Sequence, residues 1–369
     1  MKLDLNTFLP KLNLLKKVLN SKPLMEAMSN FNLYTKDGLL YINASDGENT
    51  VSINIIPTEY SEMNLCVNAL DFYNGLVNLK NGEIELQLNQ DKKLMRCSYN
   101  GGFFQFPFTD DKETCDILKI KKQDSLLEKE ISDTVEFSTA MTKAQIAIDE
   151  KHPIFRGIYF DLKQDGLVVV SCCKSMLSKY KTNTTFDDNL NGFIMSKKAI
   201  NMLISLINND DSTIMMKVGE RQVQFSSSGF VFSSVLLEGK YPNYEMLIPI
   251  DNLFSIIINK DYLIHAVQHV SLMKDLTSRL LVLNIDKDNI IIEAEDKMFY
   301  KKAKEKIECK YDGDAMIVGI NSDIIMNFLQ AIDTDEIEIR LTSPTRPLVF
   351  IPKNMADKHF MLCMPMMFR

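Results

Sequence analysis

Apolar and polar residues follow two different periods along this chain of 369 residues. In several short segments they alternate, as in Glu83–Asn89 and Glu336–Thr342, which predicts strands with one packed and one solvated face. In other segments apolar residues recur every three or four positions, as in Leu5–Leu15 and Ile200–Ile207, which predicts amphipathic helices. Such strands are typical of antiparallel sheets that helices cover on one face. The pattern therefore predicts an α+β fold.

These elements recur in the same order three times, at intervals of roughly 125 residues. Each copy is expected to hold a first helix, a strand–turn–strand segment, a second helix that begins after a polar capping residue, and another hairpin. The first helices are expected at Thr7–Leu19, Ser138–Ile148 and Lys260–Leu272. The second helices are expected at Ala69–Leu79, Lys197–Ile207 and Asp323–Ile332. The strand–turn–strand segments are Leu33–Ala44, Ile158–Cys172 and Leu281–Ala294, and the later hairpins are Glu83–Ser98, Thr213–Ser226 and Glu336–Ile351.

A repeat of this length predicts three domains, which we place at residues 1–120, 127–245 and 246–369. Charged residues near Lys119–Glu130 and two prolines near Tyr241–Asp251 mark the expected linkers. An array of similar units forms extended surfaces more readily than a single catalytic centre.

Composition narrows the class of protein further. Hydrophobic residues make up 46% and charged residues 25% of the chain, which is ordinary for a soluble globular protein. We find neither an apolar run long enough for a membrane span nor an apolar signal-peptide core near the start. The seven cysteines are irregularly spaced, and we therefore expect reduced thiols in the cytoplasm.

The net charge of −7 argues against nucleic-acid binding by the whole surface. Basic residues nevertheless recur at equivalent places in the predicted helices. Such residues either form ordinary solvated helix faces or line a surface for an anionic partner. They include Lys11, Lys16, Lys17, Lys143, Lys197 and Lys198.

The residue patterns of common enzymes are incomplete in this chain. His265 and His269 share a helix face, but Ala266 stands where a zinc protease needs its general base. Ser171–Lys174 fits one acyl-enzyme pattern, although the accompanying motifs of that class are missing. No phosphate-binding glycine loop is present. We therefore expect no catalytic residue, no metal and no cofactor.

Three further segments carry a resemblance to a known family. They are Leu237–Tyr244 with Ile248–Pro249, then Thr342–Pro347, and finally Leu362–Met366. In this order, on a threefold repeat, the chain resembles the bacterial DNA polymerase sliding clamps, the beta subunits of DNA polymerase III, over essentially its whole length. The resemblance implies three clamp-type domains with sheets outside and two helices inside. It also implies that two chains pair head to tail into a ring around duplex DNA, and that the ring tethers the replicative polymerase and meets a clamp loader and other peptide-motif partners.

The same resemblance implies residues for each contact. Binding of DNA would be independent of sequence, because contacts to phosphate carry no base information, and would weaken with salt. The implied DNA-binding residues are Lys22, Lys151, His152, Lys197 and Lys198.

The strand Phe103–Phe106 is unusually apolar for a sheet edge, so we expect a second copy to cover it. The expected dimer contacts are Phe104 and Phe106 against Leu272 and Met273.

A partner-peptide pocket is implied between the second and third domains. Its methionines would adapt to different ligands; without the resemblance, an apolar tail that merely caps a core is an equal alternative. The implied pocket residues are Phe155, Cys172, Lys174, Ser175, Met176, Leu177, Pro242, Met246, Leu247, Leu362, Cys363, Met364, Pro365 and Met366.

One stretch departs from the family pattern. Where the family usually carries Thr-Asp-Gly-His-Arg-Leu, this chain has Cys172–Leu177 and keeps only the leucine. This departure implies a pocket of altered shape and altered partner peptides, and thus a divergent clamp.

Two other classes of function compete with a DNA-encircling clamp. One is a clamp-fold interaction protein that no longer encircles DNA, which predicts helices without a net positive face. The other is an enzyme whose site these motifs miss, and the four histidines of the chain offer few bases for it.

Overall fold

The computed structural model describes residues 1–80, 82–121, 124–187, 190–210, 212–249 and 251–368. Residues 122–123 and 250, which belong to the two predicted linkers, and residue 369 lie outside the described part. The chain divides into two compact units. The first comprises Met1–Ser138 and Lys198–Leu236, and the second comprises Thr139–Lys197 and the chain from Leu237 onward. Each unit therefore combines segments from two of the three repeats.

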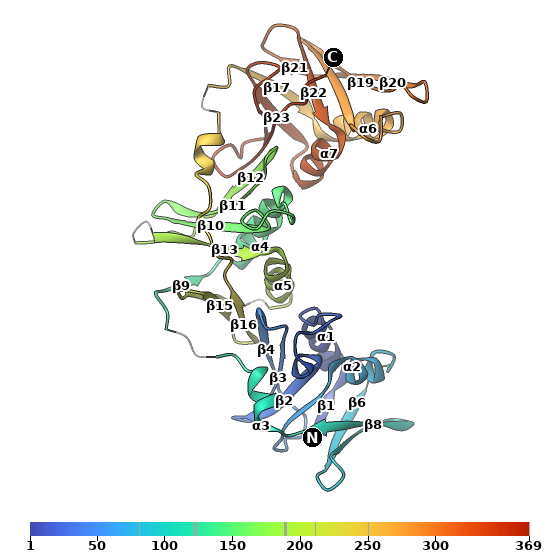
Figure 1. The fold of residues 1–369 in the computed structure, drawn as a ribbon, viewed down its shortest axis with the longest axis vertical. Helices are drawn as coiled ribbons and strands as arrows, with labels where there is room; N and C mark the ends of the chain where they lie inside the picture. The colour runs from blue at the N-terminus through green and yellow to red at the C-terminus, as the bar shows by residue number, and fades with distance from the viewer. Residues whose placement is uncertain (81, 122–123, 188–189, 211, 250, 369) are drawn as a thin grey trace. The chain divides into compact units, whose positions relative to one another are not determined.

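A single antiparallel sheet forms the frame of the first unit (Figure 1). Within the described residues it has twelve strands, in the order β1-β6-β7-β8-β5-β2-β3-β4-β16-β15-β14-β9. Ile53 of β4 lies opposite Phe230 of β16, and this pairing joins strands of the first repeat to strands of the second. The bounds are β1 Lys2–Asp4, β2 Asn30–Lys36, β3 Leu39–Ser45, β4 Asn49–Ile55, β5 Asn64–Asn68, β6 Glu83–Asn89, β7 Leu94–Tyr99, β8 Gly102–Thr109, β9 Leu127–Ile131, β14 Ile214–Val218, β15 Gln222–Ser226 and β16 Phe230–Val235.

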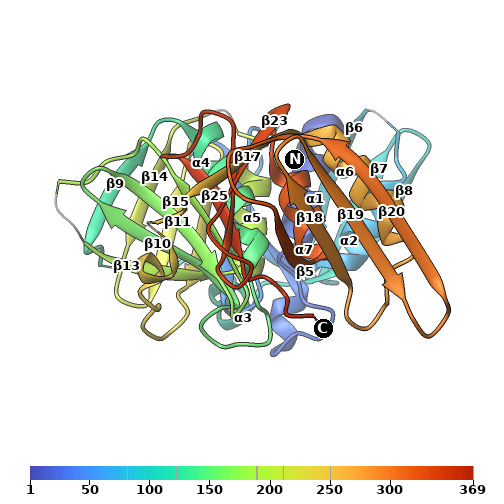
Figure 2. The ribbon, with the colours of Figure 1, turned by 90° about the horizontal axis from the view of Figure 1, so that it is seen from above.

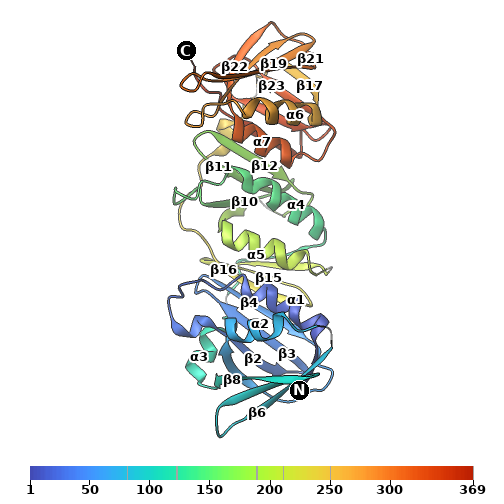
Figure 3. The same cartoon turned by 90° about the vertical axis from the view of Figure 1, so that its right-hand side faces the viewer.

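The helices α1 (Leu5–Lys16) and α2 (Ala69–Val77) pack against each other and on one face of this sheet (Figure 3). Asn68 caps α2 by accepting a hydrogen bond from the Asp71 N–H at 3.0 Å. The buried rings of Phe8 and Phe72 meet edge to face between the helices, with centroids 6.0 Å apart. The remaining helical segments that contribute to this unit are η1 (Glu26–Ser29), α3 (Lys112–Ile117), the start of α4 (Thr134–Ala144) and α5 (Lys197–Ile207) from Lys198 onward.

Two antiparallel sheets form the second unit. The larger runs β13-β10-β11-β12-β25-β24-β23-β17-β21, and the smaller runs β20-β19-β18-β22, whose first three strands lie side by side in Figure 2. Met176 of β12 lies opposite Cys363 of β25, which joins the second repeat to the third. The bounds are β10 Gly157–Lys163, β11 Gly166–Cys172, β12 Met176–Lys181, β13 Leu190–Ser196, β17 Phe254–Asn259, β18 Leu280–Asp286, β19 Asn289–Asp296, β20 Lys301–Glu308, β21 Lys310–Tyr311, β22 Met316–Asn321, β23 Glu336–Leu341, β24 Leu348–Pro352 and β25 His359–Cys363.

The helices α6 (Lys260–Ser271) and α7 (Ser322–Ala331) cover these sheets, and Asn259 and Asn321 cap their N-termini. Buried residues of both helices share one core with both sheets. Short 3₁₀ segments stand at Gln145–Ala147 (η2) and Tyr244–Leu247 (η3). Among the described helices, none is long and apolar enough to cross a membrane.

The predicted α+β fold with antiparallel sheets is confirmed, and each repeat carries its expected pair of helices: α1 with α2, α4 with α5, and α6 with α7. The Asp37–Gly38 turn shows why the sequence forms a hairpin there. Asp37 and Gly38 have φ values of 51° and 80°, the left-handed conformation that a two-residue hairpin turn requires.

Candidate functional site

A hollow in the second unit is built around the turn between β11 and β12. Cys173 closes this turn by donating its N–H to the Met176 carbonyl at 2.9 Å. Leu177, opposite Leu362 of β25, forms a buried floor, and the Met364 N–H donates to the Ser175 carbonyl at 2.8 Å. The chain just after β25 is therefore held along one side of the hollow.

Another part of the lining is formed by η3 and the residues that follow it. Tyr244 fixes η3 to β10 by donating its hydroxyl to the Asp161 carboxylate at 2.6 Å, and burial together with this bond raises the pKa of Tyr244. Lys163 adds ion pairs to Asp161 and Glu245. Because η3 is anchored in this way, Met246 and Leu247 can remain exposed at 82% and 48%. Exposed apolar side chains beside a hollow are typical of a binding site.

The cavity has a volume of about 330 Å³, which suits a few side chains of a bound peptide. Eight of the predicted pocket residues line it: Lys174, Ser175, Met176, Leu177, Met246, Leu247, Leu362 and Met364. The structure thus brings together segments that lie far apart in the sequence.

Six other predicted pocket residues lie outside this lining. Cys172 and Cys363 are buried at 1% and 0% exposure, and Pro242 is exposed beyond it. Phe155 packs beneath the site, edge to face with Tyr241 at 6.2 Å. Pro365 and Met366 continue past the pocket, where the Met366 N–H donates to a carbonyl of β22 at 2.8 Å.

Some lining residues were not predicted as pocket residues. Ile248 and Pro249 follow η3, and Arg346 and Pro347 come from the turn between β23 and β24. Arg346 forms an ion pair with Asp251 at 2.6 Å, so a charged pair stands at the rim together with the exposed Lys174. The sequence could have indicated these residues, because both segments are among those that carry the family resemblance.

The residues predicted to contact DNA differ in their surroundings. Lys22 and Lys151 are exposed. His152 stacks on Phe155, with centroids 4.4 Å apart, and its Nδ1 is buried without a hydrogen-bond partner among the described residues. Lys197 forms an ion pair with the exposed Glu150, which a phosphate can replace at low cost.

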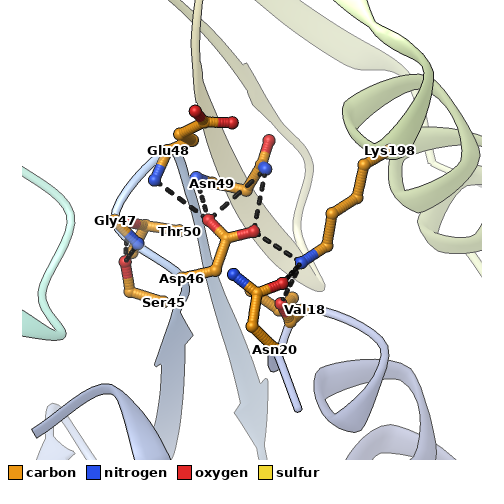
Figure 4. Close-up of polar contacts among 9 residues, drawn as sticks. All are labelled: Val18, Asn20, Ser45, Asp46, Gly47, Glu48, Asn49, Thr50 and Lys198. Carbon is orange, nitrogen blue, oxygen red and sulfur yellow. Dashed lines mark hydrogen bonds and ion pairs between the residues drawn. The ribbon is translucent and has the colours of Figure 1, made fainter. Parts of the chain in front are cut away.

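Lys198 differs from its neighbour Lys197. Its Nζ donates hydrogen bonds of 2.6 Å to the Val18 carbonyl, Asn20 Oδ1 and Asp46 Oδ2 (Figure 4). The Asp46 carboxylate also accepts from the backbone N–H groups of Glu48 and Asn49, and its side chain is only 3% exposed. An ammonium group has three hydrogens to donate, and all three are engaged here. The structure therefore gives Lys198 a stabilising role inside the first unit rather than the phosphate contact expected from the sequence.

The residues predicted for the dimer contact also differ in how far they are exposed. Leu272 and Met273 are exposed at 74% and 36% just after α6. Phe106, however, is only 7% exposed and meets Phe72 edge to face at 5.5 Å. A Cβ atom on Gly75 would lie 2.7 Å from the Phe106 ring, so the ring occupies space that only glycine leaves open. Phe106 thus belongs to the core of its own chain, which corrects the expectation that it lies exposed at the edge.

Phe104 of the same strand is partly buried, and it stacks on Tyr99 at 5.3 Å. Phe103 is 51% exposed, with the Arg96 guanidinium 3.8 Å from its ring centroid. Residues 102–107 pair with β7 on one side, whereas β5 pairs only with residues 108–109. The aromatic side chains still accessible at this edge are therefore Phe103 and, in part, Phe104.

These sheets, paired helices and a peptide-sized pocket define a three-domain clamp architecture, and comparison with known families agrees. Family models of the DNA polymerase III beta subunit match along the chain: the N-terminal domain at residues 1–108, the central domain at 131–243 and the C-terminal domain at 245–367. The chain belongs to the family of DNA polymerase III beta subunits, as the resemblance predicted.

Relatives and solved structures cover nearly the whole chain. The beta sliding clamp of Treponema pallidum is 23% identical over 353 residues, which is 92% of each chain. That of Lactococcus lactis is 21% identical over 361 residues, 95% of this chain and 94% of the relative. The griselimycin-bound DNA polymerase III subunit beta of Pseudomonas aeruginosa has a TM-score of 0.93 at 17% identity, covering 100% of this chain and 99% of that one. The beta subunit of Thermotoga maritima has a TM-score of 0.91 at 19% identity, with the same coverage.

Proposed function

We propose that this chain is a DNA sliding clamp that tethers the replicative polymerase to duplex DNA. The observation that carries the proposal is the succession of three family domains along one chain, which together match residues 1–108, 131–243 and 245–367. Relatives that carry the name beta sliding clamp match more than nine-tenths of the chain. The clamp works without a catalytic step of its own, in the cytoplasm, with domain boundaries near residues 120 and 246.

In this proposal two chains pair head to tail into a ring. Lys22, Lys151 and Lys197, with His152 as a weaker contact, face the DNA. Phosphate contacts of this kind hold DNA through charge and carry no sequence information, so the ring slides. Closure of the ring keeps the protein on DNA, and strong binding is not needed.

The pocket in the second unit receives peptides from the polymerase, the clamp loader and other partners. This role is supported by the exposed side chains of Met246, Leu247 and Met364, which group around the buried Leu177. Binding of this kind rests on a few anchor side chains that enter a pocket. Lys174 at the rim favours peptides with a nearby acidic residue, mainly by speeding association.

The experiment compares retention on DNA of different topology. The full chain is loaded by its clamp loader onto nicked circular plasmid, and half of the sample is then linearised. A clamp stays on the circle through a wash at high salt and leaves the linear molecule through its ends. Equal loss from both would exclude encirclement and favour the interaction protein that no longer surrounds DNA.

A further inference from the structure

Two cysteine thiols touch inside the first unit. The Sγ atoms of Cys66 and Cys115 lie 2.9 Å apart, and each residue is only 1% exposed. Cys66 comes from β5 and Cys115 from α3. Leu118 completes this small apolar cluster. The pair belongs neither to the peptide pocket nor to the DNA-facing residues.

The two sulfur atoms lie within reach of a disulfide bond. A disulfide bond is about 2.05 Å long, so the two sulfur atoms need to approach each other by roughly 0.9 Å. Both partners lie in the same unit, on elements that already contact each other. Cys97 in β7 offers a comparison, because it is equally buried and no thiol touches it among the described residues.

The surroundings of both thiols disfavour the thiolate form in the closed structure. Burial is the main cause that raises the pKa of Cys66 and of Cys115. The hydrogen bond between the two thiols lowers the pKa of Cys115 and raises that of Cys66, so Cys115 is taken as the attacking sulfur. The helix α3 has only six residues, and local opening of so short a helix can admit a small molecule.

We propose that Cys66 and Cys115 form an oxidation site, which hydrogen peroxide converts into a disulfide between β5 and α3. Cys115 first gives up its proton, and the resulting thiolate attacks one oxygen of hydrogen peroxide and breaks the O–O bond. The products are a sulfenic acid and a hydroxide, which takes up the proton that Cys115 released and becomes water. The Cys66 sulfur then displaces the hydroxyl group from the Cys115 sulfur, and this hydroxyl leaves as a second water with the Cys66 proton. Two thiols are oxidised to one disulfide, and one peroxide is reduced to two waters.

The disulfide would tie α3 to the sheet. The helix α3 ends at Ile117, directly before the predicted linker to the second repeat. The modification therefore fixes the last helix of the first repeat. This inference stands apart from the sliding-clamp function and does not depend on it.

Peptide mapping of the intact chain tests the proposal. The folded protein is treated with hydrogen peroxide, unfolded with alkylating reagent present, digested and analysed by mass spectrometry. We expect the loss of two of the seven thiols and a peptide pair that joins Cys66 to Cys115 and separates on reduction. Full alkylation of both cysteines, higher oxidation of either one alone, or a bond from either to a different cysteine would overturn the proposal.

Two variants serve as matched controls. Cys115→Ala should lose the joined peptide pair, whereas Cys97→Ala should retain it at the wild-type level. Circular dichroism before treatment checks that each variant is folded. If Cys115→Ala does not fold, the wild-type peptide map still decides the question.

Discussion

Two adjacent lysines show how much a single residue's role depends on its surroundings. Lys197 lies in an exposed ion pair with Glu150, whereas Lys198 binds a carboxylate that is almost wholly buried. The sequence predicted the start of α5 at these residues but assigned both lysines to DNA. The difference was not predictable, because Asp46 and Val18 reach Lys198 from segments more than a hundred residues away.

Replacing each lysine by methionine should separate stability from DNA retention. Lys198→Met leaves the Asp46 carboxylate buried without its cation, so we expect a loss of about 2–3 kcal/mol of unfolding free energy. Lys197→Met removes an exposed pair, so stability should change by less than about 0.5 kcal/mol while retention on DNA falls. Urea unfolding of both variants measures this. Equal stability of the two proteins would contradict the buried role of Lys198.

His359 should make stability depend on pH. It is 2% exposed in β25, and burial, together with the charge of Lys143, lowers its pKa from 6.5 to about 4. The unfolded chain therefore binds a proton below about pH 6.5 that the folded chain takes up only near pH 4. The contribution of this residue is constant above pH 7 and falls as the pH drops through this window.

Unfolding free energies at pH 7.5 and pH 5 test this expectation. From the two pKa values, His359 should account for a loss of about 2 kcal/mol between these conditions. His359→Gln should show a correspondingly smaller pH dependence than wild type. His265→Gln, on the exposed face of α6, should leave the dependence unchanged, and an effect as large as that of His359→Gln would show that the assignment is wrong.

At the scale of elements, strongly periodic segments were predictable and others were not. The predicted helix Lys197–Ile207 coincides with α5, because its apolar residues recur at helical spacing. The strand β20 was missed, since seven of its eight residues are only partly buried or exposed and most of the exposed residues are lysines. The six-residue helix α3 is too short to show a period. The four residues of Phe103–Phe106 predicted an exposed edge, but sequence could not reveal that Gly75 makes room for Phe106.

The segment after β25 should be needed for peptide binding and dispensable for the fold. Met364→Ala removes an exposed wall of the pocket, so we expect a loss of about 1–2 kcal/mol of binding free energy, a roughly 5- to 30-fold rise in Kd. Met367→Ala is the control, because Met367 is 78% exposed and does not line the pocket. Fluorescence anisotropy with a labelled peptide from the replicative polymerase gives both values, and equal affinities would argue against this pocket wall.

At the scale of the whole molecule, the sequence revealed the repeat but not which strands pair between one repeat and the next. The pairings β4 with β16 and β12 with β25 connect strands from different repeats. Many strands here share the same alternating pattern, and such a pattern fixes which face is buried without naming the neighbouring strand. The repeat itself predicted three domains, and the resemblance added their arrangement, with sheets outside and two helices inside each domain.

Pairing of two chains should depend on exposed residues after α6. Leu272→Asp places a charge in the proposed contact but changes little within the chain, because Leu272 is 74% exposed. We expect at least a tenfold weaker dimer whose subunits remain folded, as measured by sedimentation and circular dichroism. Ile56→Asp, at a residue 79% exposed, is the control. Phe106→Asp would mix dissociation with unfolding, because that ring is buried in its own core.

The pairing of β12 with β25 also determines how long β12 lacks a neighbour while the protein is being synthesised. These strands lie roughly 180 residues apart in the chain, and at the usual rates of protein synthesis the ribosome needs roughly 10–40 s to travel that far. Throughout that interval, one edge of β12 lacks its eventual neighbour, and an unpaired strand edge invites aggregation. We therefore expect the nascent chain to need chaperones most during synthesis of its third repeat, and slower translation of that part of the message to lengthen the exposure.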